Sequence, residues 1–299
     1  MCGLPACGKE NLGLLPIYYP IWVLKPRPLF ECVEAIAAAG FDGVQFGAAP
    51  AEDPRRVDTL SRGDAAELRS LLRSLGLGRS LHVLSDFCFA GMAARDEQVV
   101  ARATESIECA VRALCGEELP PLIVSQDPIC LPPGPKGVLA PQLIVEMLQF
   151  LVSLRERHAV RPALEHWPKP GAGTPEALRA LVEAAGGGIG ILLDTGHVNL
   201  AMRSDWCEHK TARDFIGSLP APVLEVHLHD NHGVRDEHLP PGEGSADLAG
   251  MLAELTARGF RGPVTLECDL EAPGRPGLAG GLERARRLCA KAVERGGPP

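Results

Sequence analysis

Three carboxylates and one imidazole stand at the ends of four apolar segments in the second half of the chain. Glu165 ends RPALE, Asp194 ends IGILLD, His227 ends VLEVH and Glu267 ends GPVTLE. Each segment is typical of a buried strand, and ionisable groups at the ends of several strands are the arrangement of an active site at the mouth of a β/α barrel. A buried charge without a partner is costly, so we expect these four side chains to share a cation.

Segments typical of strands and of helices alternate along the whole chain and would position these residues. The expected strands lie at 12–19, 40–46, 79–85, 120–126, 161–166, 189–194, 222–228 and 263–268. Expected helices lie at 29–39, 65–75, 94–114, 141–157 and 176–185, with further helices around the last strands, one of them beginning near Asp247. Gly40 ends the first helix, and Thr174 with Pro175 is a cap and first turn.

This alternation predicts an α/β protein with a (β/α)8 TIM barrel as its single domain. The domain would cover residues 1–299, with the barrel core at about 11–295. The strand segments are continuous apolar runs, as parallel strands buried on both faces should be. A doubly wound open sheet is the structural alternative, but no Gly-x-Gly-x-x-Gly loop follows the first strand.

Composition narrows the class of protein. The chain has 299 residues, a net charge of −8 and 45% hydrophobic residues. An acidic balance disfavours a general nucleic-acid binder. Ten cysteines without a Cys-x-x-Cys pair favour free thiols in the cytosol. No apolar run of membrane-spanning length and no signal-peptide pattern appears, so we expect a soluble cytoplasmic protein without a membrane partner.

The donor types indicate which ion would bind. Oxygen-rich sites suit Mn²⁺ or Mg²⁺, and the imidazole of His227 also admits Co²⁺ or Zn²⁺. For Asp194 a plain role as the cap of the next helix is the alternative. His197, Asp236 and His238 form a further set of two histidines and one carboxylate that could hold a second metal. The alternative is that His197 contacts substrate and the other two form a surface turn.

Three other side chains are candidates for substrate binding. His82 ends the third strand and could bind a hydroxyl group, support Glu165, or be a hydrogen-bonded core histidine. Trp167 could form an apolar wall against a sugar ring or only pack its loop. Arg235, with the glycine-rich segment 274–281, could hold a phosphate near the last helix.

The motifs LEH, LLDTGH, VHLHDN and DEHLPPGEG with the final LE resemble the xylose isomerase-like TIM barrel superfamily, which contains sugar phosphate isomerases and epimerases and the AP endonuclease family 2 enzymes. In ketose 3-epimerases of this group, positions matching Glu165, Asp194, His227 and Glu267 hold one divalent metal. The resemblance implies that Glu165 and Glu267 move a proton on opposite faces of the sugar through a metal-stabilised enediolate, and that His197 contacts substrate.

In the AP endonuclease branch, positions matching His197, Asp236 and His238 hold an additional zinc. A further zinc there needs a histidine after strand three, which His82 matches, and one after strand four, where this chain has Ser125 or Gln126. That site is therefore expected to be broken, which weakens the nuclease interpretation. Gln45 in GFDGVQFG is a second departure, since many relatives have Glu at this position.

The leading hypothesis is a metal-dependent sugar or sugar-phosphate isomerase or epimerase, with Mn²⁺, Zn²⁺, Co²⁺ or Mg²⁺ as its cofactor; iron stays open. The alternatives are a dehydratase of the inosose or dehydroshikimate type, a multinuclear non-heme iron oxidative enzyme, an AP endonuclease-like phosphodiesterase, and a barrel that binds a sugar without turnover. The expected partner is a small sugar or sugar phosphate and not nucleic acid. A homo-oligomer stays open, because members of the superfamily are often dimers or tetramers.

Overall fold

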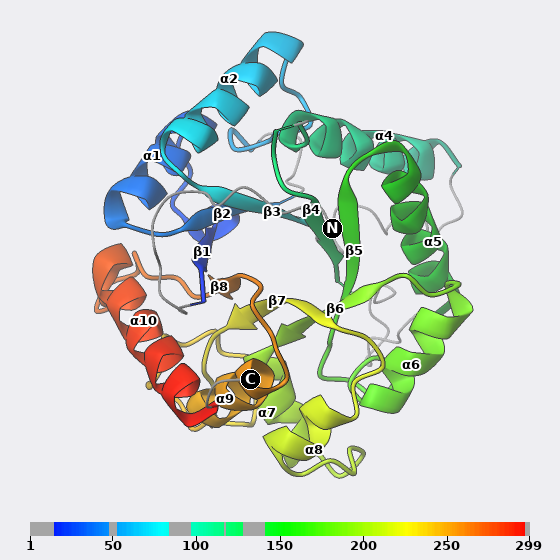
Figure 1. Cartoon of the computed structure of the whole chain (residues 1–299), viewed down its shortest axis with the longest axis vertical. Coiled ribbons are helices and arrows are strands. Elements are labelled where there is room, and N and C mark those ends of the chain that lie inside the picture. The colour runs from blue at the N-terminus through cyan, green and yellow to red at the C-terminus, as the bar shows by residue number, and fades with distance from the viewer. Residues whose placement is uncertain (1–14, 48–52, 84–96, 117, 128–140, 297–299) are drawn as a thin grey trace.

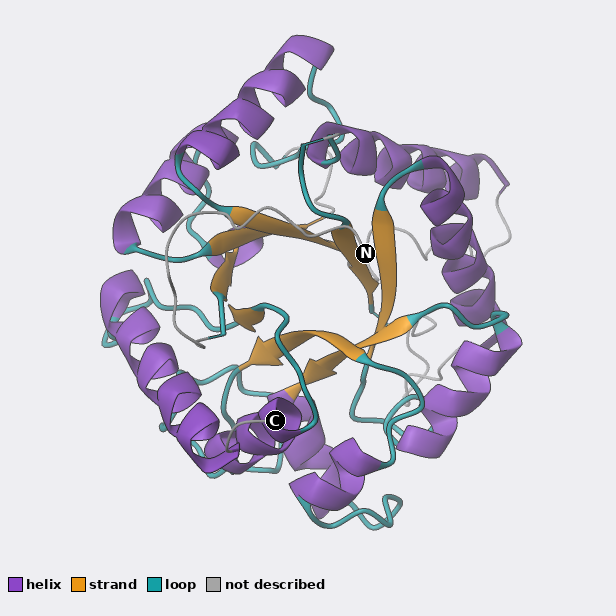
Figure 2. Cartoon of the chain, viewed as in Figure 1, coloured by secondary structure: helices purple, strands orange, loops and turns teal. Residues whose placement is uncertain are grey.

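Eight parallel strands close into one barrel, and helices surround it (Figures 1 and 2). The computed structural model of the chain describes residues 15–47, 53–83, 97–116, 118–127 and 141–296. The strands follow one another around the barrel in sequence order, and the eighth pairs with the first to close the ring. The prediction of a (β/α)8 TIM barrel is confirmed, and the open doubly wound sheet is excluded.

The strands are buried on both faces, because side chains fill the barrel inside and helices cover it outside. They are β1 (Ile17–Pro20), β2 (Gly43–Gly47), β3 (Gly78–Val83), β4 (Leu122–Gln126), β5 (Val160–Glu165), β6 (Gly190–Asp194), β7 (Val223–Leu228) and β8 (Val264–Leu266). Every expected strand is present. The parts of the first and third predictions at residues 12–14 and 84–85 lie outside the described residues.

The α-helices surround the barrel in Figure 1, and the short 3-10 helix η1 (Ile21–Val23) directly follows β1. The α-helices are α1 (Leu29–Ala39), α2 (Arg62–Ser74), α4 (Glu97–Leu114), α5 (Pro141–Arg157), α6 (Pro175–Ala184), α7 (Thr195–Arg203), α8 (Ala212–Gly217), α9 (Leu248–Ala257) and α10 (Gly277–Gly296). Two helices, α7 and α8, stand between β6 and β7, and the first turn of α7 carries His197 to the mouth of the barrel.

Local capping chemistry sets several helix ends. Gly40 ends α1 in the left-handed conformation with a φ of 93°, and the hydroxyl of Thr174 accepts from the backbone of Ala177 to cap α6, both as predicted. Helix α2 begins three residues earlier than predicted, because Ser61 caps it. The predicted start of the 94–114 helix lies partly outside the described residues.

Side chains inside the barrel form layers, because strand residues two apart share a face. The lowest layer contains the side chain of Tyr18, which fills the space beside Gly43 and Gly78. A methyl group on Gly43 would lie 2.3 Å from its ring, and one on Gly78 would lie 1.8 Å from its hydroxyl oxygen. The layer above is polar and contains Gln45, Ser80, Glu225 and Thr265. The predicted site residues lie above this polar layer, at the strand ends.

The described cysteines form no disulfide bonds with one another. Six cysteines carry free thiols, and Cys2, Cys7, Cys88 and Cys130 lie outside the described residues. Within the described ranges, no helix has both the length and the apolar character needed to cross a bilayer.

Candidate metal centre

Four predicted side chains converge at the mouth of the barrel, and we call Glu165, Asp194, His227 and Glu267 the first cluster. Glu165 and Asp194 end β5 and β6, His227 is the last residue but one of β7, and Glu267 directly follows β8. Ligand-type atoms of Glu165, Asp194 and His227 all lie within 4.8 Å of one another. Nδ1 of His227 lies 2.8 Å from Oε2 of Glu267 and 3.6 Å from Oε1 of Glu165.

The donor set fits a divalent cation. Nδ1 of His227 and Oε2 of Glu165 are buried, and neither makes a hydrogen bond within the described part of the chain. Glu267 lies close to Nδ1, but the contact is not directed as a hydrogen bond. Buried polar atoms are rarely left without a partner, so two such atoms among three carboxylates and an imidazole support a shared ion. The assignment of the four residues as ligands stays a prediction.

Proton affinities in the first cluster are strongly perturbed. Burial raises the pKa of Glu165 well above its ordinary value, and Asp127 adds to this effect. Burial also opposes charge on Asp194 and Glu267, yet neighbouring imidazoles hold the pKa of both carboxyls below the ordinary value. Against its own burial, His227 has its pKa raised to about 9, mainly by Glu267. A cation that binds here must therefore displace protons from Glu165 and His227.

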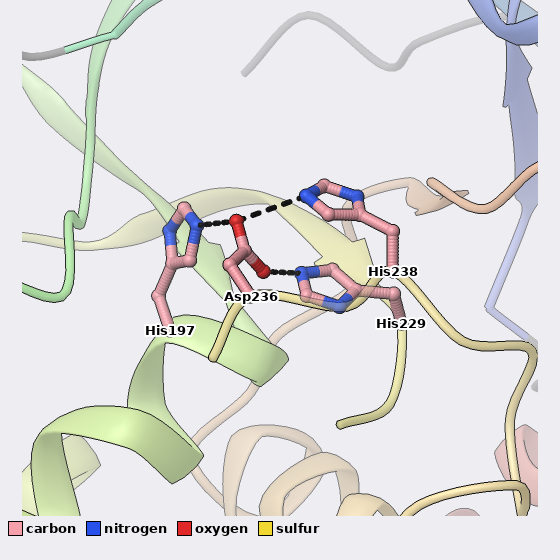
Figure 3. A group of neighbouring side chains, drawn as sticks. All are labelled: His197, His229, Asp236 and His238. Atoms are coloured by element: carbon pink, nitrogen blue, oxygen red, sulfur yellow. Dashed lines mark hydrogen bonds and ion pairs between the residues drawn. The ribbon is translucent and has the colours of Figure 1, made fainter. Parts of the chain in front are cut away.

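A second cluster consists of His197, His229, Asp236 and His238, and Figure 3 shows the three imidazoles around the carboxylate. Nε2 of His197 and Nε2 of His238 lie 3.2 and 3.0 Å from Oδ2 of Asp236. Nε2 of His229 lies 3.6 Å from Oδ1 of the same residue. The structure thus brings together the three residues predicted as a second set and adds one histidine; their role as ligands stays a prediction.

Backbone carbonyls determine which nitrogen faces the carboxylate. Nδ1 of His197 donates to the carbonyl of His166 at 2.7 Å, and Nδ1 of His238 donates to the carbonyl of Glu267 at 3.0 Å. A carbonyl only accepts, so Nδ1 carries the hydrogen and Nε2 points at Asp236. Metal-ligating histidines are commonly oriented in this way.

The backbone at His238 supports a functional role. Its φ is 47°, the one positive value outside glycine among the described residues. Such a conformation costs on the order of 1–3 kcal/mol and is concentrated at functional sites. Although burial opposes the charge, Asp236 raises the pKa of His238 to about 10. The pKa of His197 also rises to about 10, against burial and mainly through Asp194.

His229 is a member that the sequence analysis did not include in either candidate metal set. Its Nε2 lies 2.9 Å from Oδ1 of Asp194, and its ring stacks on His238 with the centroids 4.0 Å apart. It therefore links the two clusters. The spacing from His227 was the available signal, since residues two apart share a strand face.

A third group contains His82, Asp127 and Glu165, whose ligand-type atoms also lie within 4.8 Å of one another. Nε2 of His82 lies 2.6 Å from Oδ1 of Asp127 and 3.5 Å from Oε2 of Glu165. Sequence analysis found no ligand at the end of the fourth strand because it stopped at Ser125 and Gln126. Asp127 follows one residue later and shares the inward face of Ser125.

Of the remaining candidates for substrate binding, Trp167 lies at the site and Arg235 does not. The ring of Trp167 lies 4.9 Å from that of His197, and its buried Nε1 lacks a hydrogen-bond partner among the described residues. Trp22, which the sequence analysis did not consider, stacks on His82 with the centroids 5.6 Å apart. Arg235 stays outside this group: its side chain is 80% exposed and pairs with Glu237.

The fold and the site define a member of a known class. The chain belongs to the xylose isomerase-like TIM barrel family, whose model matches residues 33–288. This confirms the resemblance drawn from the sequence motifs, and the family contains sugar isomerases and epimerases.

Two curated relatives match in part. A 3-dehydroshikimate dehydratase from Pseudomonas putida is 27% identical over 267 residues, which are 84% of this chain and 38% of that protein. An uncharacterised protein from Methanocaldococcus jannaschii is 32% identical over 124 residues, which are 40% of this chain and 41% of that protein. The matched regions span less than half of either relative.

Several solved structures share the fold. An L-ribulose 3-epimerase has a TM-score of 0.69 at 18% identity, covering 95% of this chain and 96% of its own. A D-tagatose 3-epimerase-like protein has a TM-score of 0.68 at 20% identity, covering 94% and 98%. A protein named IOLI, with a bound zinc atom, has a TM-score of 0.66 at 17% identity, covering 95% and 100%. At these identities the likeness concerns the fold.

Proposed function

We propose that this protein is a metal-dependent isomerase or epimerase of a sugar or sugar phosphate. The observation that carries the proposal is the first cluster, in which three carboxylates and Nδ1 of His227 meet at the mouth of the barrel. Active sites of TIM barrels lie at this end. The epimerases among the similar structures and the family membership support the same reaction class.

Glu165, Asp194, His227 and Glu267 would hold one divalent ion: Mn²⁺, Zn²⁺, Co²⁺ or Mg²⁺. The zinc atom in the similar structure of IOLI supports a divalent metal. Iron is the alternative ion for this site. When bound, such an ion acts as a Lewis acid that polarises a substrate carbonyl. The second cluster would hold a further ion through His197, Asp236 and His238, with His229 beside them.

Glu165 and Glu267 are the proposed proton-transfer residues. They reach the mouth from β5 and β8, with β6 and β7 between them, so their carboxylates approach a bound sugar from two sides. One carboxylate removes the hydrogen alpha to the carbonyl, and the other returns a proton on the opposite face. Both lie close to Nδ1 of His227, which keeps the two groups at a single reaction centre.

His82, His197 and Trp167 would orient the substrate, which we expect to be a small sugar and not a nucleic acid. The indole of Trp167 and the imidazole of His197 meet edge to face and offer an apolar surface with a polar edge. Arg235 would reach a phosphate only by leaving Glu237, so its part in binding is the weakest of the set.

Proton transfer can be tested directly. Metal-loaded protein incubated with a panel of ketoses and ketose phosphates in D₂O should exchange the hydrogen alpha to the carbonyl for deuterium, read by NMR. Protein treated with a chelator is the control and should be inactive. Failure to exchange with any member of this panel would contradict the proposal.

A dehydratase is the second candidate, because the match to the 3-dehydroshikimate dehydratase covers 84% of this chain. Elimination of water also begins with removal of an alpha proton, so the same carboxylates serve both reactions. The two are separated by product: an epimerase returns a sugar of unchanged mass, whereas a dehydratase gives a conjugated product that absorbs ultraviolet light and is lighter by one water.

A further inference from the structure

A buried chain of hydrogen bonds runs beneath the first cluster. Nε2–H of His227 donates to Oε1 of Gln45 at 3.0 Å, and the amide nitrogen of Gln45 donates to Oε1 of Glu225 at 2.9 Å. All three side chains are 0% exposed. Gln45 comes from β2 and the other two from β7, so the chain crosses the interior of the barrel.

The surroundings of Glu225 determine which way the amide of Gln45 points. Oε1 of Glu225 also accepts from the hydroxyls of Ser80 and Thr265, at 2.9 and 2.6 Å. Because this oxygen acts as an acceptor, the group of Gln45 that faces it must be a donor, which is the NH₂ group and not the carbonyl. The carbonyl of Gln45 is therefore directed at His227.

The direction of the amide selects the nitrogen that can bind a metal. A carbonyl only accepts, so Nε2 of His227 must carry a hydrogen. The lone pair that can bind a cation is then on Nδ1, which faces Glu165 at 3.6 Å and Glu267 at 2.8 Å. Hydrogen bonds on the far nitrogen of a metal-ligating histidine set both its tautomer and its orientation.

We propose that Gln45, oriented by Glu225, is a positioning residue that fixes His227 to bind a divalent cation through Nδ1. Gln45 lies one layer below the mouth, and His227 separates it from the substrate space, so it acts only through the imidazole. This inference rests on the proposed metal centre and is independent of which sugar is the substrate.

The arrangement also gives a physical role to the glutamine at position 45. A glutamate there would place a second carboxylate against Glu225, which lies 2.9 Å from the amide nitrogen of Gln45. Two buried carboxylates at that distance repel each other strongly. With glutamine at position 45, a single carboxyl group, that of Glu225, lies one step farther from His227, and the neutral amide joins the two by hydrogen bonds.

The test is a set of variants that remove and restore this chain of hydrogen bonds. Gln45→Leu removes both hydrogen bonds, and Gln45→Glu keeps an acceptor for His227 but opposes Glu225. The double variant Gln45→Glu with Glu225→Gln exchanges the two groups and restores the hydrogen bonds from His227 to position 45 and between positions 45 and 225, while the hydroxyls of Ser80 and Thr265 lose their shared acceptor. Gln126→Leu is the matched control, because Gln126 is equally buried in β4 and its amide makes no hydrogen bond among the described residues.

The first readout is Zn²⁺ affinity, measured by isothermal titration calorimetry. We expect Gln45→Leu and Gln45→Glu each to weaken binding at the first cluster by about 10- to 100-fold, the range found when partners of metal-ligating histidines are removed. The double variant should recover to within a few-fold of wild type. Gln126→Leu should match wild type.

The second readout is the protonation state of the two ring nitrogens of His227 in the Zn²⁺-loaded wild-type protein. Long-range ¹H–¹⁵N NMR detects these nitrogens, and their loss in His227→Gln assigns them. We expect a protonated Nε2 and a metal-shifted Nδ1. This spectrum tests the tautomer of His227 even if the variants at positions 45 and 225 do not fold.

Three results would overturn the inference. Equal affinity of wild type, Gln45→Leu and Gln45→Glu would remove Gln45 from the metal centre. A protonated Nδ1 with zinc on Nε2 would reverse the proposed tautomer. A wild-type protein that binds no Zn²⁺ would contradict the proposed metal centre itself, whereas the first two results would contradict only the role of Gln45 or the tautomer of His227.

Discussion

At the scale of single residues, the two glutamates of the first cluster differ in their pKa. Burial and Asp127 raise the pKa of Glu165, whereas His227 offsets the burial of Glu267 and holds its pKa below the ordinary value. Neighbours of opposite charge thus separate two chemically identical groups, as in sites where one acid holds a proton while the other can accept one.

We predict that Glu165→Gln and Glu267→Gln each lower alpha-proton exchange by at least about 100-fold, because an amide cannot take up the proton. Exchange in D₂O measures the rate, and circular dichroism confirms the fold. Glu283→Gln is the control, since Glu283 lies on α10 with 66% of its side chain exposed. Activity of either site variant equal to that of the control would remove that residue from the proton-transfer step.

At the scale of elements, the first turn of α7 connects the two clusters. Asp194 caps this helix by accepting from the backbone of His197 at 2.7 Å, so the helix start orients a residue of each cluster. Gly196, between them, packs against the ring of His229. A Cβ on Gly196 would lie 1.9 Å from Cε1 of His229, which leaves no room for a side chain.

We predict that Gly196→Ala destabilises the protein by about 1–3 kcal/mol, the usual cost of overpacking, and weakens metal binding at the second cluster by displacing His229. Gly63→Ala is a matched control, because Gly63 is also the second residue of its helix and a Cβ there would meet nothing closer than 3.6 Å. The control should be neutral or more stable by about 0.5–1 kcal/mol, since alanine favours helix. Urea unfolding checks both; equal stabilities would contradict the packing argument.

At the scale of the whole molecule, the charged mouth couples stability to pH and to metal. His197, His227 and His238 have pKa values of about 10, 9 and 10 in the fold, against 6.5 ordinarily. A raised pKa stabilises the folded state fully below the unfolded value and loses that contribution as the pH rises through the folded value. Glu165 acts in the same direction.

We therefore predict that chelator-treated protein becomes less stable as the pH rises from about 6.5 to 10. Denaturant unfolding at a series of pH values measures this trend. A metal-free protein whose free energy of unfolding stays flat or increases over this window would show that the carboxylate–imidazole contacts do not stabilise the fold.

The stabilisation that a bound metal contributes should depend on pH in the opposite direction. Protons and cations compete for Glu165 and His227, so the stabilisation by added Zn²⁺ or Mn²⁺ should grow as the pH rises from 6 to 8. At 100 times the dissociation constant, a bound ion adds about 2.7 kcal/mol. The difference in unfolding temperature between loaded and chelator-treated protein at each pH is the measurement, and a constant difference would contradict competition.

Much of the architecture could be predicted from local pattern. Apolar runs and helix signals placed all eight strands, and Thr174 and Gly40 marked helix ends, because capping and burial periodicity are short-range properties. The helix start at Ser61 was missed because a run of polar residues precedes the first apolar position. The first cluster was found for the same local reason, since each member ends an apolar segment.

The chain alone determined that a barrel would carry Glu165, Asp194, His227 and Glu267 to one edge, because the carboxyl ends of parallel strands share a face of the barrel. Only the tertiary structure decided that His229 and Asp127 join them and that Gln45 meets His227. Those contacts join strands and loops that lie up to 182 residues apart, and no local periodicity encodes which side chains meet across a closed barrel.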